Sequence, residues 1–239
     1  MPDRPDEHSV HRPEVLLFDV NETLVDIDAL APLFEQQFGG AAVLREWFGQ
    51  LVLYSMTTTL AGTYADFFTL ARGVATMVGR IHDIAVDSTW LDHLVDGMLT
   101  MPAHPDVPPA LERLKFSGFR LATLTNSPPD VHGRSALRHS GLAAMFERTF
   151  TVHQQRAFKP APQVYLEACA ALGIAPSDCM MVAAHPWDTL GAQKVGCRAA
   201  LITREGNAAL PLPSLPQPEI EVPDLHALCE RLTALSTRS

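Results

Sequence analysis

The chain has 239 residues, enough for one sizeable domain or for a core domain with a smaller inserted one. Hydrophobic residues make up 47% and charged residues 19%, a balance typical of globular proteins with a large core. The formal net charge is −9 and the sequence has no run of lysine or arginine. We therefore expect no nucleic-acid partner and no attachment to an anionic membrane.

Cysteine usage and the N-terminal sequence indicate the cellular compartment. The four cysteines show no C-x-x-C spacing, which is typical of reduced, buried thiols rather than of a disulfide framework: Cys169, Cys179, Cys197 and Cys229. The first fourteen residues are polar and contain proline, unlike a signal peptide. No apolar stretch approaches the roughly 20 residues that a membrane span needs. We expect a cytoplasmic protein.

In chain order, short apolar runs alternate with amphipathic segments of helical length. The runs that we predict as strands are Val15–Phe18, Phe119–Leu124, Thr149–Val152, Met180–Ala183 and Ala199–Ile202. The helices predicted among them are Pro108–Phe116, Val131–His139, Pro162–Leu172 and Thr189–Val195. This alternation predicts an α/β fold, a Rossmann-like parallel sheet core with helices on both faces.

One long segment interrupts the alternation after the first strand. From about Asp28 to His104 only helical patterns occur, such as Val43–Leu60, Tyr64–Met77 and Thr89–Leu99. We therefore predict a core domain at 14–27 and 104–239, with an all-helical cap subdomain at 28–103. Ligands of open α/β sheets bind at the carboxyl ends of the strands, where such a cap would exclude water.

Polar residues follow the predicted strands in succession. Asp19 follows the first strand, Thr125 and Asn126 the second, Lys159 the third, and Asp188 lies just beyond the fourth. Taken singly, each has an ordinary structural explanation as a turn residue, a helix cap or a solvated charge. Together and in this order they predict a convergent polar site at one edge of the sheet.

These residues resemble the motifs of the haloacid dehalogenase superfamily, and more closely its 2-haloacid dehalogenase branch. Phe18-Asp19-x-x-x-Thr23-Leu24 is similar to the first motif and Leu124-Thr125-Asn126 to the second. Lys159-Pro160 with Tyr165 resembles the third, and Trp187-Asp188-x-x-Gly191-Ala192 the fourth. The segment Ile202–Asn207 is also similar to the family's sequence after the last core strand.

The resemblance implies a hydrolase that acts on a small 2-substituted carboxylic acid, with a possible homodimer as its assembly. Asp19 would attack the α-carbon as a nucleophile, and water would then hydrolyse the aspartyl ester. Lys159 would keep Asp19 ionised, while Thr23 and Asp188 would support these steps. The implied substrate-binding residues are Thr125, Asn126, Phe48, Trp47, Phe67 and Tyr165.

Two positions separate the possible reactions within the superfamily. Its phosphatases carry a second aspartate two residues after the nucleophile and acidic residues in the fourth motif that hold Mg²⁺. Here Asn21 occupies the first position and His185 lies where a carboxylate is expected. A halide leaves without an acid, so we expect displacement at carbon with no metal and no cofactor. His185 is either a base for ester hydrolysis or a hydrogen-bonding spacer.

The sequence departs from the dehalogenase branch at the halide site. Members of that branch carry an arginine directly after a tryptophan in the cap, whereas Phe48 follows Trp47 here and Arg45 precedes it. Ala183-Ala184 also lacks the family's hydroxyl. Three interpretations remain: an (S)-2-haloacid dehalogenase with an altered halide site, a related hydrolase that opens a strained ring such as azetidine-2-carboxylate, and a catalytically weak binding protein.

Overall fold

The computed structural model describes residues 12–130 and 132–236. Its sheet has six parallel strands in the order β3-β2-β1-β4-β5-β6. The strands are β1 (Val15–Phe18), β2 (Arg120–Thr125), β3 (Arg148–Thr151), β4 (Cys179–Ala183), β5 (Arg198–Ile202) and β6 (Ile220–Val222). The α/β class and the Rossmann-like parallel sheet predicted from the sequence are confirmed.

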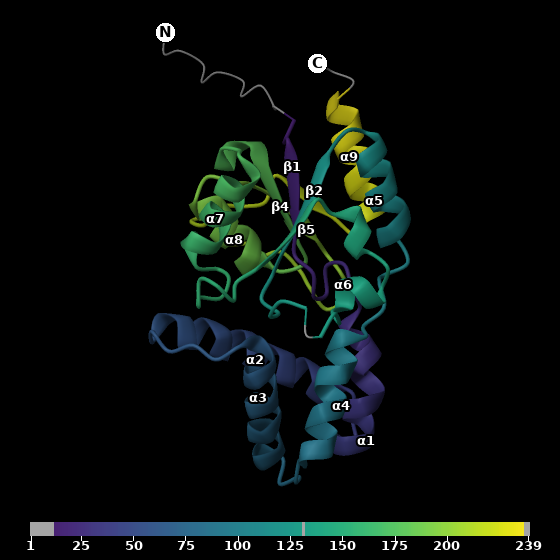
Figure 1. The fold of residues 1–239 in the computed structure, drawn as a ribbon, viewed down its shortest axis with the longest axis vertical. Helices are drawn as coiled ribbons and strands as arrows, with labels where there is room; N and C mark the ends of the chain where they lie inside the picture. The colour runs from purple at the N-terminus through teal and green to yellow at the C-terminus, as the bar shows by residue number, and fades with distance from the viewer. Residues whose placement is uncertain (1–11, 131, 237–239) are drawn as a thin grey trace.

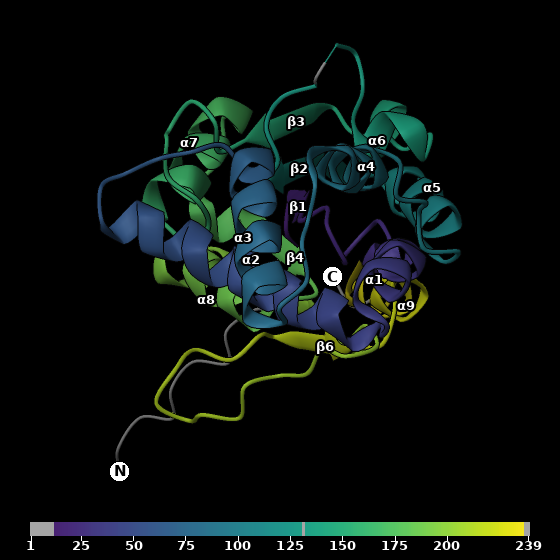
Figure 2. The ribbon, with the colours of Figure 1, turned by 90° about the horizontal axis from the view of Figure 1, so that it is seen from below.

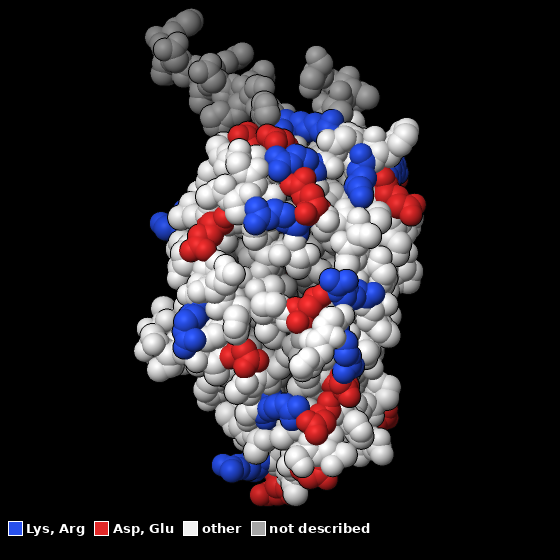
Figure 3. Space-filling model, viewed as in Figure 1, with Lys and Arg blue, Asp and Glu red and all other residues white. Residues whose placement is uncertain are grey.

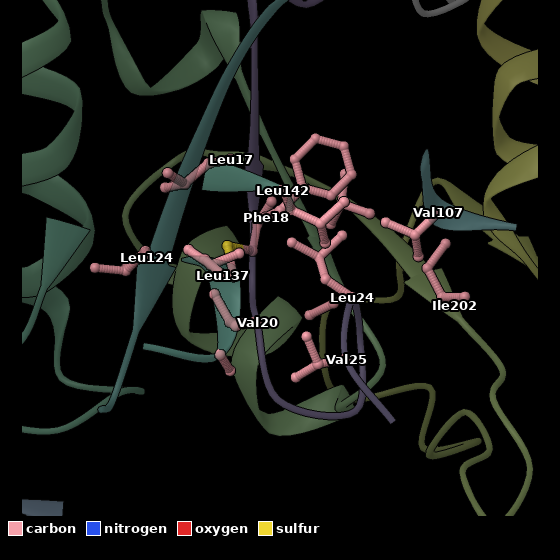
Figure 4. Close-up of a cluster of buried hydrophobic side chains, with 14 of the residues drawn as sticks. Leu17, Phe18, Val20, Leu24, Val25, Val107, Leu124, Leu137, Leu142 and Ile202 are labelled. Carbon is pink, nitrogen blue, oxygen red and sulfur yellow. The ribbon is translucent and has the colours of Figure 1, made fainter. Parts of the chain in front are cut away.

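The central strand β1 determines where the site lies. All four of its residues are buried, as expected for a parallel strand covered on both faces. Figure 4 shows Phe18 and Leu17 in a cluster of buried apolar side chains that also contains Leu24. Phe18 pairs with β2 on one side and with β4 on the other, so the next residue, Asp19, lies where the strand order changes direction. Ligands of doubly wound sheets bind at this switch point.

Helices cover both faces of the sheet (Figure 1). On one face lie α5 (Val107–Phe116) and α9 (Leu225–Ser236), and on the other α7 (Pro162–Leu172) and α8 (Pro186–Lys194). The remaining core helices are α6 (Ala136–His139) and the 3-10 helices η2 (Ala143–Met145) and η3 (Pro176–Asp178). Proline at the start of α7 and α8 suits the first helical turn, where a missing backbone N–H is harmless.

The segment after β1 forms a group of helices below the carboxyl ends of the strands (Figures 1 and 2). It comprises η1 (Ile27–Leu30), α1 (Ala31–Phe38), α2 (Ala42–Leu60), α3 (Phe67–Ile81) and α4 (Ser88–Leu99). Asp66 and Asp87 cap α3 and α4 by accepting hydrogen bonds from backbone N–H groups of the first turn. Phe34 joins the helices by packing against Trp47 and Trp90, with ring centroids 5.2 and 5.3 Å away.

The chain passes between the sheet and these helices at two adjacent places. Val25 forms an antiparallel bridge with Ala103, and His104 N–H donates to Leu24 O at 3.0 Å. These contacts join the segment that enters the helical group to the segment that leaves it. We therefore propose 28–103 as a cap subdomain and 14–27 with 104–239 as the core domain.

Several elements differ from the sequence-based predictions. The helix predicted at Val131–His139 is wrong in extent, because only Ala136–His139 is helical and Val131 lies outside the described residues. His132 and Gly133 have φ of 50° and 78°, which excludes a right-handed helix there. Ser135 then caps the short helix. The helix α9 and the three-residue strand β6, which follows a proline-rich stretch, were not predicted, whereas α1 lies within the segment predicted to be all-helical.

The surface carries mixed charge. On the face shown in Figure 3, acidic and basic side chains are interspersed rather than gathered by sign. Within the described residues, none of the helices combines the length and apolar character needed to cross a membrane.

Candidate active site

The carboxyl edge of the sheet brings the predicted polar residues together. Asp19 directly follows β1, Asn126 follows β2, and Asp188 lies in the first turn of α8, just beyond β4. Lys159 comes from the loop between β3 and α7. All four side chains are buried, and Lys159 is only 1% exposed. A buried lysine needs anionic partners, since an isolated buried charge is strongly destabilising.

Lys159 is the centre of this cluster. Its Nζ lies 2.6 Å from Asp19 Oδ1 and 2.6 Å from Asp188 Oδ2, and it also donates to Leu124 O at 3.0 Å. The three hydrogens of the ammonium group thus have three oxygen acceptors. The backbone N–H of Lys159 donates to Asn126 Oδ1 at 3.0 Å, which ties the loop to the end of β2.

Asp188 is held from its other side by Tyr165. The Tyr165 hydroxyl donates to Asp188 Oδ1 at 2.6 Å, so both carboxylate oxygens of Asp188 are engaged. Gly191 is required here, because a Cβ at this position would lie 2.5 Å from Pro160 Cβ and 2.7 Å from the Tyr165 hydroxyl. The glycine of the fourth motif therefore permits α8 to approach the lysine loop closely.

Thr23 orients the second oxygen of Asp19. Its hydroxyl donates to Asp19 Oδ2 at 2.8 Å and accepts a hydrogen bond from Ala184 N–H at 2.9 Å. Arg204 holds the same loop from outside, since it donates to Thr23 O at 3.0 Å and pairs with Asp106 at 2.8 Å. Asp19 is thus held through both of its carboxylate oxygens.

His185 lies between two carboxylates. Its Nε2–H donates to Glu22 Oε2 at 2.6 Å, while Nδ1 faces Asp19 Oδ2 at 3.5 Å. Nδ1 is buried and has no hydrogen-bond partner. Glu22 also forms an ion pair with Arg45 of α2, and Arg45 contacts Asp28 at 3.0 Å. Glu22 adopts a positive φ of 63°, an uncommon conformation for a residue other than glycine.

These contacts change the pKa values of the cluster. Burial raises the pKa of a carboxyl group, but Lys159 and His185 outweigh it and hold the pKa of Asp19 well below its usual range. Burial also opposes the ammonium form of Lys159, yet its carboxylate partners Asp188 and Asp19 raise its pKa. The site therefore contains an ionised carboxylate beside a charged lysine.

The imidazole of His185 responds in the same way. Burial lowers its pKa, but Asp19 and Glu22 outweigh this effect and raise the pKa of His185 to about 9. For Glu22, burial raises the pKa, while His185 and Arg45 lower it by a larger amount. At neutral pH the resting site therefore holds a protonated His185 between two carboxylates.

A small cavity lies above Asp19. It is lined by Asp19, Asn21, Phe48, Val52, Phe67, Asn126, His185 and Trp187. The ring of His185 is stacked on Trp187 at 5.0 Å and lies 5.9 Å from the ring of Phe48. No arginine is among the described residues that line this cavity. A larger hollow nearby shares Asn21 as a lining residue and includes Thr125 and Ser127.

The structure separates the predicted substrate-binding residues into two groups. Phe48, Phe67 and Asn126 line the cavity, and Thr125 lines the neighbouring hollow. Trp47 and Tyr165, in contrast, are not among the residues lining either space. Trp47 is fully buried in the cap, where its Nε1–H donates to Ala71 O at 3.0 Å. In this structure Trp47 packs within the cap and Tyr165 donates a hydrogen bond to Asp188.

Glu22 and Arg204 contact this site although sequence reasoning assigned neither a role; Arg204 lies in the segment Ile202–Asn207 that resembles the family's sequence. The hydrogen bond between Glu22 and His185 joins residues that are 163 positions apart in the chain, so no local sequence pattern could predict it. The only local signal was an acidic residue placed inside the first motif.

Comparison with known proteins places this arrangement among hydrolases. A family model described as haloacid dehalogenase-like hydrolase matches residues 13–196. The chain is 30% identical over 193 residues to (S)-2-haloacid dehalogenase 4A of Burkholderia cepacia, covering 80% of this chain and 83% of that protein. It is also 30% identical over 190 residues to (S)-2-haloacid dehalogenase 1 of Pseudomonas sp. (strain CBS-3), with 79% and 83% covered.

A solved structure extends the similarity to three dimensions. A dehalogenase crystallised as an intermediate complex superposes with a TM-score of 0.85 at 27% identity, covering 93% of this chain and 98% of that one.

Proposed function

Because the chain belongs to the haloacid dehalogenase-like hydrolase family, we propose that it is an (S)-2-haloacid dehalogenase acting through an aspartyl-ester intermediate. One observation supports this most directly: Lys159 Nζ lies 2.6 Å from Asp19 Oδ1 in a buried site. This contact keeps the carboxylate ionised and therefore nucleophilic. The relatives compared above are dehalogenases by name, which favours this reaction over the ring-opening and binding interpretations.

In the first step, Asp19 attacks the α-carbon of a small 2-haloacid from the side opposite the halogen. A carbon–oxygen bond forms as the carbon–halogen bond breaks, and the halide departs with the bonding electron pair. Thr23 and Lys159 hold one carboxylate oxygen each, which fixes the direction of attack. Asp188 positions Lys159 and is itself positioned by Tyr165.

The substrate is held in the space between the core and the cap. Thr125, Asn126 and backbone N–H groups at the strand ends offer the polar contacts for its carboxylate. Phe48 and Phe67 provide the apolar wall of the cavity beside Asp19. Four of its eight lining residues are polar, namely Asp19, Asn21, Asn126 and His185, so polar groups converge beside the nucleophile.

In the second step, water attacks the carbonyl carbon of the Asp19 ester. Esterification removes the negative charge of Asp19 and with it one of the two anionic partners of His185. At 3.5 Å and an effective dielectric of 20, that partner contributes about 5 kcal/mol of attraction before relaxation. The pKa of His185 therefore falls in the intermediate, and the imidazolium releases its Nδ1 proton to solvent water. The neutral imidazole then accepts a proton from the attacking water. Glu22 keeps the remaining N–H on Nε2, so that Nδ1 faces the ester.

We propose that both steps proceed without a metal ion. Asn21 and His185 replace oxygen ligands that Mg²⁺ would use, and both oxygens of Asp188 are engaged by Lys159 and Tyr165. The ammonium group of Lys159 lies between the two carboxylates, where it supplies the positive charge.

We also propose a cytoplasmic homodimer. The four cysteines are free and buried, in keeping with a reducing compartment. Leu53, Tyr54 and Leu60 of α2 are 53%, 38% and 90% exposed, and we propose that a second copy of the chain covers these apolar side chains. Light scattering coupled to size-exclusion chromatography tests the dimer, and Leu60→Glu is expected to weaken it.

The reaction is tested with a panel of substrates. Purified protein should release halide from (S)-2-chloropropionate and yield the 2-hydroxy acid, with little activity on azetidine-2-carboxylate or on phosphate monoesters. Turnover of azetidine-2-carboxylate with no halide release would favour the ring-opening hydrolase. Binding of haloacids without turnover of any substrate would favour a binding protein.

A further inference from the structure

We propose that Cys169, Cys179 and Cys197 form a binding site for trivalent arsenic, which enters as arsenous acid. This site is separate from the reaction at Asp19. The cysteines lie toward the amino ends of β4 and β5, whereas Asp19 follows the carboxyl end of β1. The inference therefore does not rest on the proposed function.

The fold brings three cysteines from separate segments together. Cys179 is the first residue of β4, and Cys197 directly precedes β5. Because the following residues, Met180 and Arg198, are paired in the sheet, the two cysteines are neighbours across the strands. Cys169 belongs to the buried side of α7, which covers the same face of the sheet as α8 (Figure 1). A helix and two strands thus each supply one thiol.

The spacing of the sulfur atoms suits a single bound ion. All three Sγ atoms lie within 4.8 Å of one another, and those of Cys169 and Cys197 are 3.9 Å apart. An ion that bonds to each of three sulfurs at about 2.3 Å, the length found in zinc–thiolate sites, requires the sulfurs to be about 4 Å apart. The three thiols are therefore already close to the arrangement that a three-coordinate ion needs.

The number of ligands and their charge favour a trivalent ion. No histidine or carboxylate from residues 12–130 or 132–236 joins this group, so the ligands are three thiolates. Thiolates bind soft ions, but Zn²⁺ prefers a fourth ligand. Three thiolates carry three negative charges, which As(III) cancels, whereas Zn²⁺ would leave one and Cu⁺ two.

This charge balance matters because the cluster is buried. Cys179, Cys169 and Cys197 are 0%, 1% and 6% exposed, and a buried charge without compensation is strongly destabilising. Arg198, the cation next to Cys197 in the sequence, pairs with Glu219 at 2.7 Å. A neutral arsenic tris-thiolate therefore fits these surroundings better than an anionic complex of zinc or copper.

The exchange of ligands requires no other reactant. Arsenous acid is uncharged at neutral pH, so it enters a buried site without the cost of dehydrating an ion. Each thiol forms one arsenic–sulfur bond as one arsenic–oxygen bond breaks, and the thiol proton leaves with the hydroxide as water. Three exchanges release three water molecules, and arsenic remains trivalent throughout. Cys197, the most exposed of the three, is positioned to react first.

The test titrates the full chain with sodium arsenite in the presence of a phosphine reductant and a metal chelator. Near-ultraviolet absorbance of the arsenic–sulfur bonds should saturate at one equivalent. Intact-mass spectrometry should then show the gain of one arsenic and the loss of three hydrogens. Cys169→Ala and Cys197→Ala should each weaken binding at least about a hundredfold, because one of three linked attachments is lost. The arsenic that these variants bind should retain one hydroxyl group.

Cys229→Ala is the matched control. This cysteine is also buried, but it lies in α9, where its Sγ contacts Ala110 O of α5 at 3.4 Å. The variant should bind arsenite as the wild type does, and thermal melts check that all three variants are folded. Peptic digestion of the wild-type complex at low pH needs no variant, and should yield the Cys169, Cys179 and Cys197 peptides joined through arsenic.

Four results would overturn the inference. They are no arsenite binding by the folded wild type, unchanged binding in Cys169→Ala and Cys197→Ala, a joined peptide that contains Cys229, and one equivalent of bound Zn²⁺ that arsenite does not displace. Halide release by the arsenite-free protein is measured separately, so failure of this site and failure of the proposed function are distinguishable.

Discussion

Replacing Lys159 with methionine removes the cation from the centre of the site while retaining an apolar side chain of similar length. At 2.6 Å and an effective dielectric of 20, each of its two carboxylate contacts contributes about 6 kcal/mol of attraction before relaxation. If relaxation and solvent screening halve the attraction of one contact, about 3 kcal/mol is lost with the lysine. A barrier higher by that amount slows the reaction more than a hundredfold. We expect the first-turnover halide release of Lys159→Met to fall at least a hundredfold.

The same substitution should destabilise the fold. Asp188 is fully buried, and removal of one partner from a buried ion pair costs about 3–5 kcal/mol. Burial raises the pKa of Asp188 even beside Lys159, and removal of the cation raises it further. The loss should therefore shrink as the pH is lowered, because protonated Asp188 needs no counter-ion. Urea unfolding across pH measures this dependence.

A double variant separates stability from chemistry. Lys159→Met combined with Asp188→Asn removes the unpaired carboxylate, so it should recover most of the lost stability without recovering turnover. Turnover of Lys159→Met within tenfold of wild type would refute the reasoning. So would recovery of turnover in the double variant, because Lys159 would then act only by neutralising Asp188.

Three further predictions concern the metal, the cavity and the proton. Exhaustive EDTA treatment should change halide release less than twofold, and strong Mg²⁺ dependence with phosphatase activity would overturn the metal-free reaction. Phe48→Arg should raise the rate of chloride release from 2-chloropropionate, since a cation would be added to the anion site. A variant with an unchanged melting temperature and slower chloride release would contradict the presence of a leaving anion in this cavity. Glu22→Gln removes an anion that raises the pKa of His185, so the acid limb of the pH–rate profile for ester hydrolysis should move to lower pH. Rapid-quench measurements across pH test this shift. An unchanged acid limb would exclude the influence of Glu22 on the pKa of His185.

The residues that sequence reasoning placed correctly share one property. Asp19, Asn126 and Asp188 come directly after strands or open the following helix, and parallel strands bring all such positions to one edge. The apolar runs of β1 and β4 were therefore enough to predict that these groups meet. Gly191 was identified only through the resemblance of the fourth motif, and the close approach of Tyr165 explains why a glycine is needed there.

What sequence reasoning could not reach depends on contacts between distant segments. The hydrogen bond between Glu22 and His185 depends on the positive φ of Glu22 and on the path of the loop that follows β4. The orientation of the Trp47 side chain toward the interior of the cap depends on how α2 packs against Phe34. The strand β6 has three residues and gains its stability from β5 rather than from its own pattern. Such features arise from tertiary packing, which overrides local propensity.

The covalent role of Asp19 is the central claim, and a single turnover in ¹⁸O-labelled water tests it most directly. With enzyme in excess over (S)-2-chloropropionate, the new oxygen of the lactate should come from Asp19 and carry no label, while mass spectrometry of the Asp19 peptide shows one ¹⁸O. On later turnovers the label should appear in the product. Label entering lactate in the first turnover, with an unlabelled Asp19 peptide, would mean that water attacks the substrate directly and would contradict the nucleophilic role of Asp19.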